Sequence, residues 1–133
     1  MARVMGIGGV FFKAKGDPKA LAAWYQKHLG VELKPFGGAL FRWPQDTGAD
    51  KGATAWMLAA SDSKWFSPSE SSFMINYRVD DLDALVAHLN QSGVKIIQGP
   101  ESHENGKFAW LMDPDGNKVE LWEPMVADAK NDD

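Results

Sequence analysis

The residue of this sequence best placed to do chemistry is a single carboxylate, Glu120. It lies in the run DPDGNKVELW at positions 113–122. Asp-Pro-Asp-Gly is a tight-turn sequence, because proline presets φ and glycine accepts a positive φ. The segments on either side, 107–112 and 117–122, are predicted strands of a β-hairpin. Alternation in the second strand places Glu120 on the face opposite Val119 and Leu121, so it faces either a pocket or bulk solvent.

Two similar sets of elements must position this hairpin. In the first, a helix begins at Asp17-Pro18 and is ended by Gly30, and Gly37-Gly38 forms a two-residue turn between strands. In the second, a helix lies between the cap Asp81 and Gly93. The predicted strands are 7–15, 31–36, 39–43 and 53–59 in the first set, and 73–79, 94–98, 107–112 and 117–122 in the second.

The two sets are an internal repeat. Asp17 and Gly52 match Asp81 and Gly116 at the same shift of 64 residues. This predicts an α+β fold of two βαβββ modules in a pseudo-twofold arrangement, which form a curved, partly open sheet with helices on the convex side and a shared concave face. The predicted boundaries are a single domain at 1–124 (module one about 7–60, linker 61–72, module two 73–124) and a polar C-terminal tail at 125–133.

Composition narrows the class of protein. The 133 residues carry a net charge of −4, and lysine and arginine form no cluster, which argues against a nucleic-acid partner. Cysteine is absent, so disulfides and thiolate chemistry are excluded. The sequence shows no apolar signal core and no membrane-spanning run, so we expect a cytoplasmic protein. Six Trp and seven Phe are many for this length, and some are expected to line a cavity or an interface, with Trp65 and Phe66 of the linker tucked against other residues.

The repeat groups Glu120 with three other positions that are expected to be equivalent in the two modules. Glu120 corresponds to Trp56 at the shift of 64, and Gly9 corresponds to Met74 on the first strands of the two modules. All four are expected to point into the concave face. Strand alternation adds further side chains to that face, which are Phe11, Lys13, Asn76, Arg78, Phe108, Trp110, Met112, Lys118 and Trp122. We expect ligand contacts from Phe11, Trp56, Met74, Asn76, Arg78, Trp110 and Trp122.

The paired module resembles the vicinal oxygen chelate superfamily, which includes glyoxalase I, extradiol dioxygenases and the fosfomycin and bleomycin resistance proteins. The likeness is carried by DPDGNKVEL at 113–121 and by RVDDLDAL at 78–85, and it extends over roughly residues 7–124. Metal-using members place His, Gln or Glu on the first and last strands of each module. Here those positions are Gly9, Trp56, Met74 and Glu120, of which only Glu120 can ligate. The resemblance therefore implies no cofactor, because a catalytic metal usually takes three protein ligands.

The three histidines are candidate acids, bases or ligands. His103 lies in a polar loop beside the expected pocket mouth and could serve as an acid or base, although a solvated surface histidine is the simpler interpretation. His28 completes an apolar helical row, and His88 has no partner pattern around it.

Three functions remain open from the sequence. The first is a metal-independent binder of an aromatic or amphipathic small molecule, similar to the bleomycin-resistance type. The second is an enzyme, either a lyase or isomerase that uses Glu120 as a base, or a metalloenzyme that recruits ligands from elsewhere. The third is an interaction module whose concave face is filled by its own aromatic side chains. The resemblance also implies a homodimer.

Overall fold

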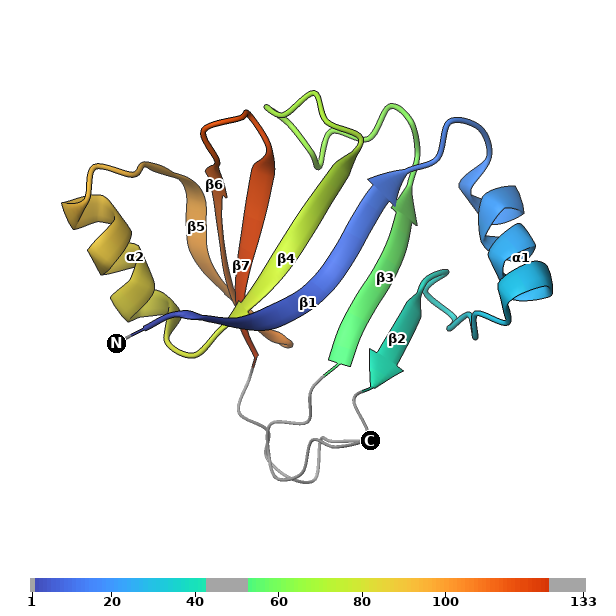
Figure 1. The fold of residues 1–133 in the computed structure, drawn as a ribbon, viewed down its shortest axis with the longest axis horizontal. Helices are drawn as coiled ribbons and strands as arrows, with labels where there is room; N and C mark the ends of the chain where they lie inside the picture. Colours follow the sequence, from blue (N-terminus) through green and yellow to red (C-terminus); the bar gives the residue numbers. More distant parts are fainter. Residues whose placement is uncertain (1, 43–52, 125–133) are drawn as a thin grey trace.

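The computed structural model describes residues 2–42 and 53–124, which form two helices and one seven-stranded sheet (Figure 1). The predicted tail at 125–133 lies outside the described residues. Module one contains β1 (Val4–Lys13), α1 (Pro18–Leu29), β2 (Ala39–Arg42) and β3 (Ala53–Ala59). Module two contains β4 (Phe73–Val79), α2 (Leu82–Gln91), β5 (Ile96–His103), β6 (Gly106–Met112) and β7 (Lys118–Pro124).

The helices begin where the capping residues predict. The Asp17 carboxylate accepts a hydrogen bond from the Lys19 amide at 3.0 Å, and Asp81 accepts one from the Ala84 amide at 3.0 Å. Each carboxylate satisfies an amide that has no partner within its helix. Gly30 ends α1 in the left-handed conformation, with φ of 71°. In the described residues neither helix is long and apolar enough to cross a membrane.

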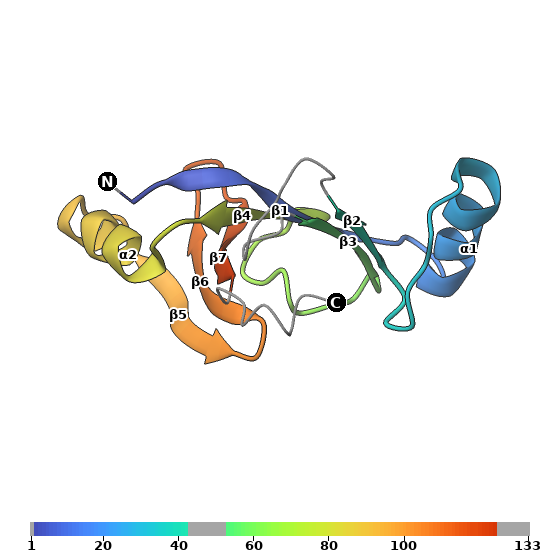
Figure 2. The same ribbon diagram turned by 90° about the horizontal axis from the view of Figure 1, so that it is seen from below.

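The sheet has the strand order β2-β3-β1-β4-β7-β6-β5, and it is open at both edges. In each module the first strand pairs in parallel with the last, so β1 lies beside β3 and β4 lies beside β7. The two first strands, β1 and β4, pair antiparallel at the centre. This repetition confirms the pseudo-twofold arrangement, and Figure 2 shows the sheet curling around the linker with the helices at its two ends.

The predicted strand at 31–36 is wrong. Residues 31–34 belong to no strand, and the chain turns at Pro35 and Phe36. The Lys34 amide donates to the Gly38 carbonyl at 2.8 Å, and the Gly37 amide donates to the Lys34 carbonyl at 2.9 Å. These bonds close a local turn instead of a ladder, and Pro35 has no amide to donate to one. Module one therefore contributes three strands and module two contributes four.

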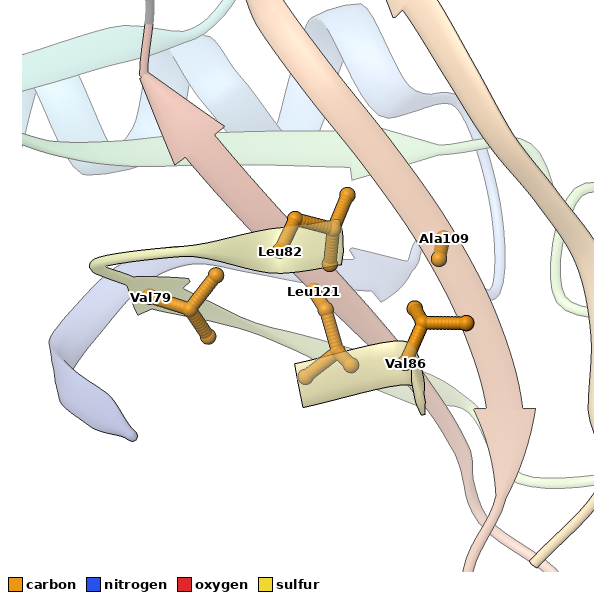
Figure 3. Packing of buried hydrophobic residues seen from close by; sticks show 5 residues of the cluster. All are labelled: Val79, Leu82, Val86, Ala109 and Leu121. Atoms are coloured by element: carbon orange, nitrogen blue, oxygen red, sulfur yellow. The ribbon is translucent and has the colours of Figure 1, made fainter. Parts of the chain in front are cut away.

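The main hydrophobic core lies between α2 and the sheet. Val79, Leu82, Val86, Ala109 and Leu121 are buried together there, and Figure 3 shows their side chains converging from α2 and three strands. Val119 packs against the same cluster. Since Val119 and Leu121 face α2, the residue between them, Glu120, faces the other side of the sheet. We call that opposite side the inner face.

The linker covers part of the inner face. Phe66 is fully buried and packs with Phe11, Met74 and Trp110 in a second hydrophobic cluster. The Trp65 ring lies 4.6 Å from the Phe11 ring, and the Trp65 carbonyl accepts a hydrogen bond from Lys118 Nζ at 2.7 Å. The expectation that Trp65 and Phe66 are tucked against other residues is confirmed for Phe66, while Trp65 packs on Phe11 and stays 37% exposed. The linker therefore packs against both modules, and Phe108 of β6 lies against the same cluster.

Candidate functional site

Glu120 is held by two N–H donors on neighbouring strands. Asn76 Nδ2 donates to Glu120 Oε1 at 2.6 Å, and Trp110 Nε1 donates to Oε2 at 2.8 Å. Asn76 on β4 and Trp110 on β6 are the register partners of Glu120 on β7, so three strands present one row of side chains. Glu120 is only 3% exposed. The alternative of a solvated glutamate on an open sheet is therefore wrong.

Burial decides the ionisation of this carboxyl. Removal from water raises the pKa of Glu120, while the hydrogen bonds from Asn76 and Trp110 and the charge of Lys118 offset part of the rise. Burial also lowers the pKa of Lys118, and the charge of Glu120 counters it. A carboxyl of this kind keeps its proton to a higher pH than an exposed glutamate. It can therefore act as a proton donor or acceptor nearer neutrality.

A pair of glycines on β1, Gly8 and Gly9, leaves room for the row of Asn76, Trp110 and Glu120. The β1–β4 register passes from Ile7 opposite Tyr77 to Gly9 opposite Asn76, with an irregularity between them. A Cβ placed on Gly8 would overlap Asn76 Oδ1 and would lie 2.7 Å from Trp122 Cε3. Only glycine fits there. Gly8 was not identified from the sequence, although a glycine pair inside a predicted strand is a signal of a bulge or a close approach.

The oxygen of the Asn76 side-chain amide is also buried. This atom, Oδ1, has no hydrogen-bond partner among the described residues. An unpaired buried acceptor costs about 1–3 kcal/mol. Rotation of the Asn76 amide would let Oδ1 accept the proton of a protonated Glu120, so the pair can accommodate both ionisation states of the carboxyl.

The predicted position of Trp56 is wrong. Its ring lies 5.1 Å from the Tyr25 ring of α1 and 5.8 Å from the Phe12 ring, on the side of the sheet that α1 covers. The neighbouring Met57 packs with the cluster on the inner face instead. Side chains on a strand alternate, so a shift of one residue reverses the face. Trp56 therefore cannot share a pocket with Glu120.

An aromatic row crosses the inner face of module two. The Phe108 ring stacks with the Trp110 ring at 6.1 Å and 14°, and with the Trp122 ring at 6.2 Å and 11°. Trp122 Nε1 donates to the Asn105 carbonyl at 2.8 Å, which fixes its indole. Phe108 and Trp122 are partly exposed, whereas Trp110 is buried. The linker does not pack on Trp122 in the way that it packs on Phe11 and Met74.

The remaining predicted ligand-binding residues divide between two places. Phe11 and Met74 are buried under the linker with Phe66. Arg78 is buried on β4, opposite Trp122 of β7. The structure thus brings Asn76, Trp110 and Glu120 into contact and leaves Trp56 apart from them. Contact of any of these residues with a ligand stays a prediction.

As oriented here, the neighbours of Glu120 present N–H groups to it. Its two hydrogen-bond partners, Asn76 Nδ2 and Trp110 Nε1, point protons at the carboxylate and offer no lone pair to a cation. Within residues 2–42 and 53–124, no group of three or more His, Cys, Asp or Glu side chains is placed to hold one. His103 pairs with Glu101 at 3.0 Å and does not join Glu120.

Solved structures of known proteins share this architecture. A methylmalonyl-CoA epimerase from Mycobacterium tuberculosis is 20% identical, with a TM-score of 0.62 over 92% of this chain and 89% of that one. A Streptomyces coelicolor methylmalonyl-CoA epimerase (Q60A) in complex with 2-nitronate-propionyl-CoA is 18% identical, with a TM-score of 0.64 over 92% and 99%. A glyoxalase/bleomycin resistance protein/dioxygenase superfamily member from Vibrio splendidus 12B01 is 16% identical, with a TM-score of 0.56 over 92% and 99%.

No curated protein matches the chain. The sequence model of the Glyoxalase/Bleomycin resistance protein/Dioxygenase superfamily matches residues 11–121, which include β4, β6 and the row of Asn76, Trp110 and Glu120. With the paired modules and the open seven-stranded sheet, this match establishes that the chain belongs to the Glyoxalase/Bleomycin resistance protein/Dioxygenase superfamily.

Proposed function

We propose that this protein is a metal-independent binder of an aromatic or amphipathic small molecule. The ligand lies on the inner face of module two, against Phe108 and Trp122. The stack of three near-parallel rings is the observation that carries the proposal. A planar ligand extends such a stack, and each aromatic pair contributes about 0.5–1.5 kcal/mol beyond simple burial.

Glu120 gives this surface its polar character. Its carboxyl lies beside Trp110 and holds that indole in place through a 2.8 Å hydrogen bond. It also places negative charge, or a proton donor, within a mostly apolar face. Small-molecule sites commonly combine aromatic walls with a few such polar groups. Glu120 therefore orients the Trp110 ring of this face.

The location is tested by NMR of the indole N–H groups. Addition of 2-naphthol, a planar probe, should shift the Trp122 signal, while the Trp24 signal should not move because Trp24 lies on α1. Signals are assigned with Trp122→Phe and Trp24→Phe. Shifts confined to Trp24, or none at saturating probe, would contradict the proposal.

A second candidate is an enzyme that uses Glu120 to move a proton. The raised pKa of Glu120 favours it, since a general acid or base works best near the operating pH. Two of the structural relatives are methylmalonyl-CoA epimerases by name, and epimerisation requires removal and return of a proton. At 18–20% identity they share the fold, so the activity is a proposal for this chain.

Deuterium exchange distinguishes the two candidates. The protein is incubated with methylmalonyl-CoA in D₂O, and deuterium at the carbon between the carboxylate and the thioester is measured by mass spectrometry. Deuterium incorporation by the wild type that is lost in Glu120→Gln would establish the enzyme function. Equal incorporation by the wild type and Glu120→Gln would contradict it and leave the binding function.

We also propose a homodimer. Module one exposes large apolar side chains on α1 and on the edge strand β2, namely Trp24, Leu29 and Phe41. Clusters of exposed apolar residues commonly mark protein interfaces.

A further inference from the structure

A polar cluster lies on β5, at the outer edge of the aromatic row. Gln98 Nε2 donates to Glu101 Oε2 at 2.8 Å, and the other carboxylate oxygen, Oε1, lies 3.0 Å from His103 Nε2. The His103 ring lies 5.7 Å from the Phe108 ring. Phe108 is the central ring of the stack, so this cluster borders the platform proposed for the ligand.

A bulge builds the cluster. Gln98 and Glu101 are three residues apart and would point to opposite faces of a regular strand. The β5–β6 register is interrupted between them, from Gln98 opposite Trp110 to Glu101 opposite Phe108. Gly99 makes this possible with φ of 88°, and a Cβ there would lie 2.7 Å from the Phe108 carbonyl oxygen. Bulges of this kind re-aim side chains next to functional sites.

The cluster fixes the orientation and tautomer of His103. Hydrogen bonds from Gln98 and His103 lower the pKa of Glu101, so its carboxylate is ionised and only accepts. The Nε2 atom of His103 must then carry a proton. In the neutral ring this leaves Nδ1 as a free acceptor, the arrangement by which a carboxylate prepares an imidazole to accept a proton.

His103 lies at the opposite edge of the platform from Glu120. The β6 strand, with Phe108 and Trp110, separates β5 from β7. His103 pairs with Gly106 and Glu120 pairs with Trp110, four residues further along β6, so the two positions are roughly 16 Å apart at about 4.8 Å per strand and 3.3 Å per residue.

We propose that His103, oriented by Glu101 and Gln98, is a second polar anchor of this face and accepts a hydrogen bond through Nδ1 from a hydroxyl on an aromatic ligand. The ligand class is thereby narrowed to hydroxylated aromatics of the phenol or naphthol type. This inference rests on the proposed aromatic binding site and adds to it the recognition of a ring hydroxyl.

Two probes test the inference, one with a hydroxyl group and one in which a methyl group replaces the hydroxyl proton. 2-Naphthol can donate to His103, whereas 2-methoxynaphthalene has the same rings and no donor. The affinity of each is measured by quenching of tryptophan fluorescence. The wild-type protein should prefer 2-naphthol by about tenfold, the contribution of one hydrogen bond. His103→Phe should abolish the preference, because phenylalanine keeps a ring beside Phe108 and has no acceptor.

Glu104→Gln is the matched control, since it changes the neighbouring exposed residue of the same segment and should keep the preference. If His103→Phe keeps the tenfold preference, His103 is not the anchor, although the aromatic site stands. If the wild-type protein binds neither probe, the binding site and this inference both fail. Nitrogen-15 NMR of neutral His103 gives a ligand-free check, because a proton on Nδ1 instead of Nε2 would overturn the proposed acceptor.

Discussion

At the scale of single residues, the site depends on how a carboxyl is buried. Glu120 meets N–H donors from two adjacent strands and lies beside a buried indole. These contacts stabilise the ionised form, yet removal from water outweighs them and the pKa of Glu120 rises. Metal-using relatives are expected to employ this position for a ligand. In this chain its two neighbours donate N–H hydrogen bonds to it.

Glu120→Gln should change how stability depends on pH. The raised pKa means that the folded state retains a proton that the unfolded state releases, so stability falls as the pH rises through the folded pKa. The contribution is fully present below the ordinary pKa of glutamate. A neutral glutamine removes this dependence. The variant should therefore gain about 1 kcal/mol over the wild type at pH 8, or about 4 °C in Tm, and less at pH 5.

Thermal unfolding of the wild type and of Glu120→Gln between pH 5 and pH 8 measures this difference in stability. A Glu120→Gln variant that is less stable than the wild type at pH 8, with a gap that narrows at pH 5, would show that the fold favours the ionised carboxylate. That result would contradict a raised pKa of Glu120.

At the scale of elements, the β1 irregularity at Gly8 leaves room for side chains of the inner face. Gly8 lies against Asn76 and the Trp122 ring, so Gly8→Ala should force one of them to move. We expect a loss of about 2 kcal/mol, as for other overpacked positions. Gly16→Ala is the control, because a Cβ there meets nothing within 4 Å and the change should stay within about 0.5 kcal/mol.

Urea unfolding of the two alanine variants measures this difference. Equal stability of Gly8→Ala and Gly16→Ala would mean that the side chains of Asn76 and Trp122 do not require a glycine at position 8.

The linker is the second element with a testable role. Phe66 is fully buried in the cluster with Phe11, Met74 and Trp110, so Phe66→Ala should leave a cavity and cost about 3–5 kcal/mol. Phe73→Ala removes the same side chain where it is 41% exposed, and should cost about 1 kcal/mol or less. Denaturant midpoints of the two variants are compared. A loss of about 1 kcal/mol or less in both variants would show that burial of Phe66 does not contribute to the stability of the fold.

Sequence patterns predicted the helices and three of the four strands of module two well, because caps, glycine stops and alternating strands are local signals. The predicted strand 94–98 is β5, which continues to His103, so the polar loop predicted to hold His103 is wrong. Sequence patterns also failed where the register between modules mattered. Trp56 was aligned with Glu120 through Gly52 and Gly116, at a shift of 64. Phe11 pairs with Met57 as Asn76 pairs with Glu120, so the counterpart of Glu120 is Met57. One residue of difference reversed the face.

Two further features could not be found from the sequence. The stretch 31–36 alternates like a strand, but its turn and Pro35 leave it without a ladder, which depends on tertiary pairing. The Gln98–Glu101–His103 cluster needs the bulge at Gly99, since regular alternation separates its members. The aromatic row was expected in part, and its third ring, Phe108, was assigned to the correct face by alternation.

At the scale of the whole molecule, the inner face is divided. The linker buries Phe66 against Phe11 of module one and against Met74 and Trp110 of module two, while Phe108 and Trp122 stay partly exposed beside that cluster. The idea of a concave face filled by its own side chains therefore describes one part of it. A ligand is expected only on the part that carries Phe108 and Trp122.

The proposed homodimer predicts a molecule of twice the chain mass in solution. Its contacts should come from module one, so Leu29→Lys together with Phe41→Lys should shift the protein to monomer while the fold remains, because each adds a charge to an exposed apolar side chain. Sedimentation equilibrium measures the mass. A wild-type monomer at high concentration, or a variant that still dimerises, would contradict this interface.

The central claim is that an aromatic ligand binds module two without a metal. The most direct test is a fluorescence titration of the wild type and Trp122→Ala with 2-naphthol, each with and without a strong chelator. We predict that the chelator leaves the wild-type affinity unchanged and that Trp122→Ala weakens it by up to about tenfold, the contribution of one stacked pair. Binding that disappears with the chelator, or that is equally strong in Trp122→Ala, would contradict the account.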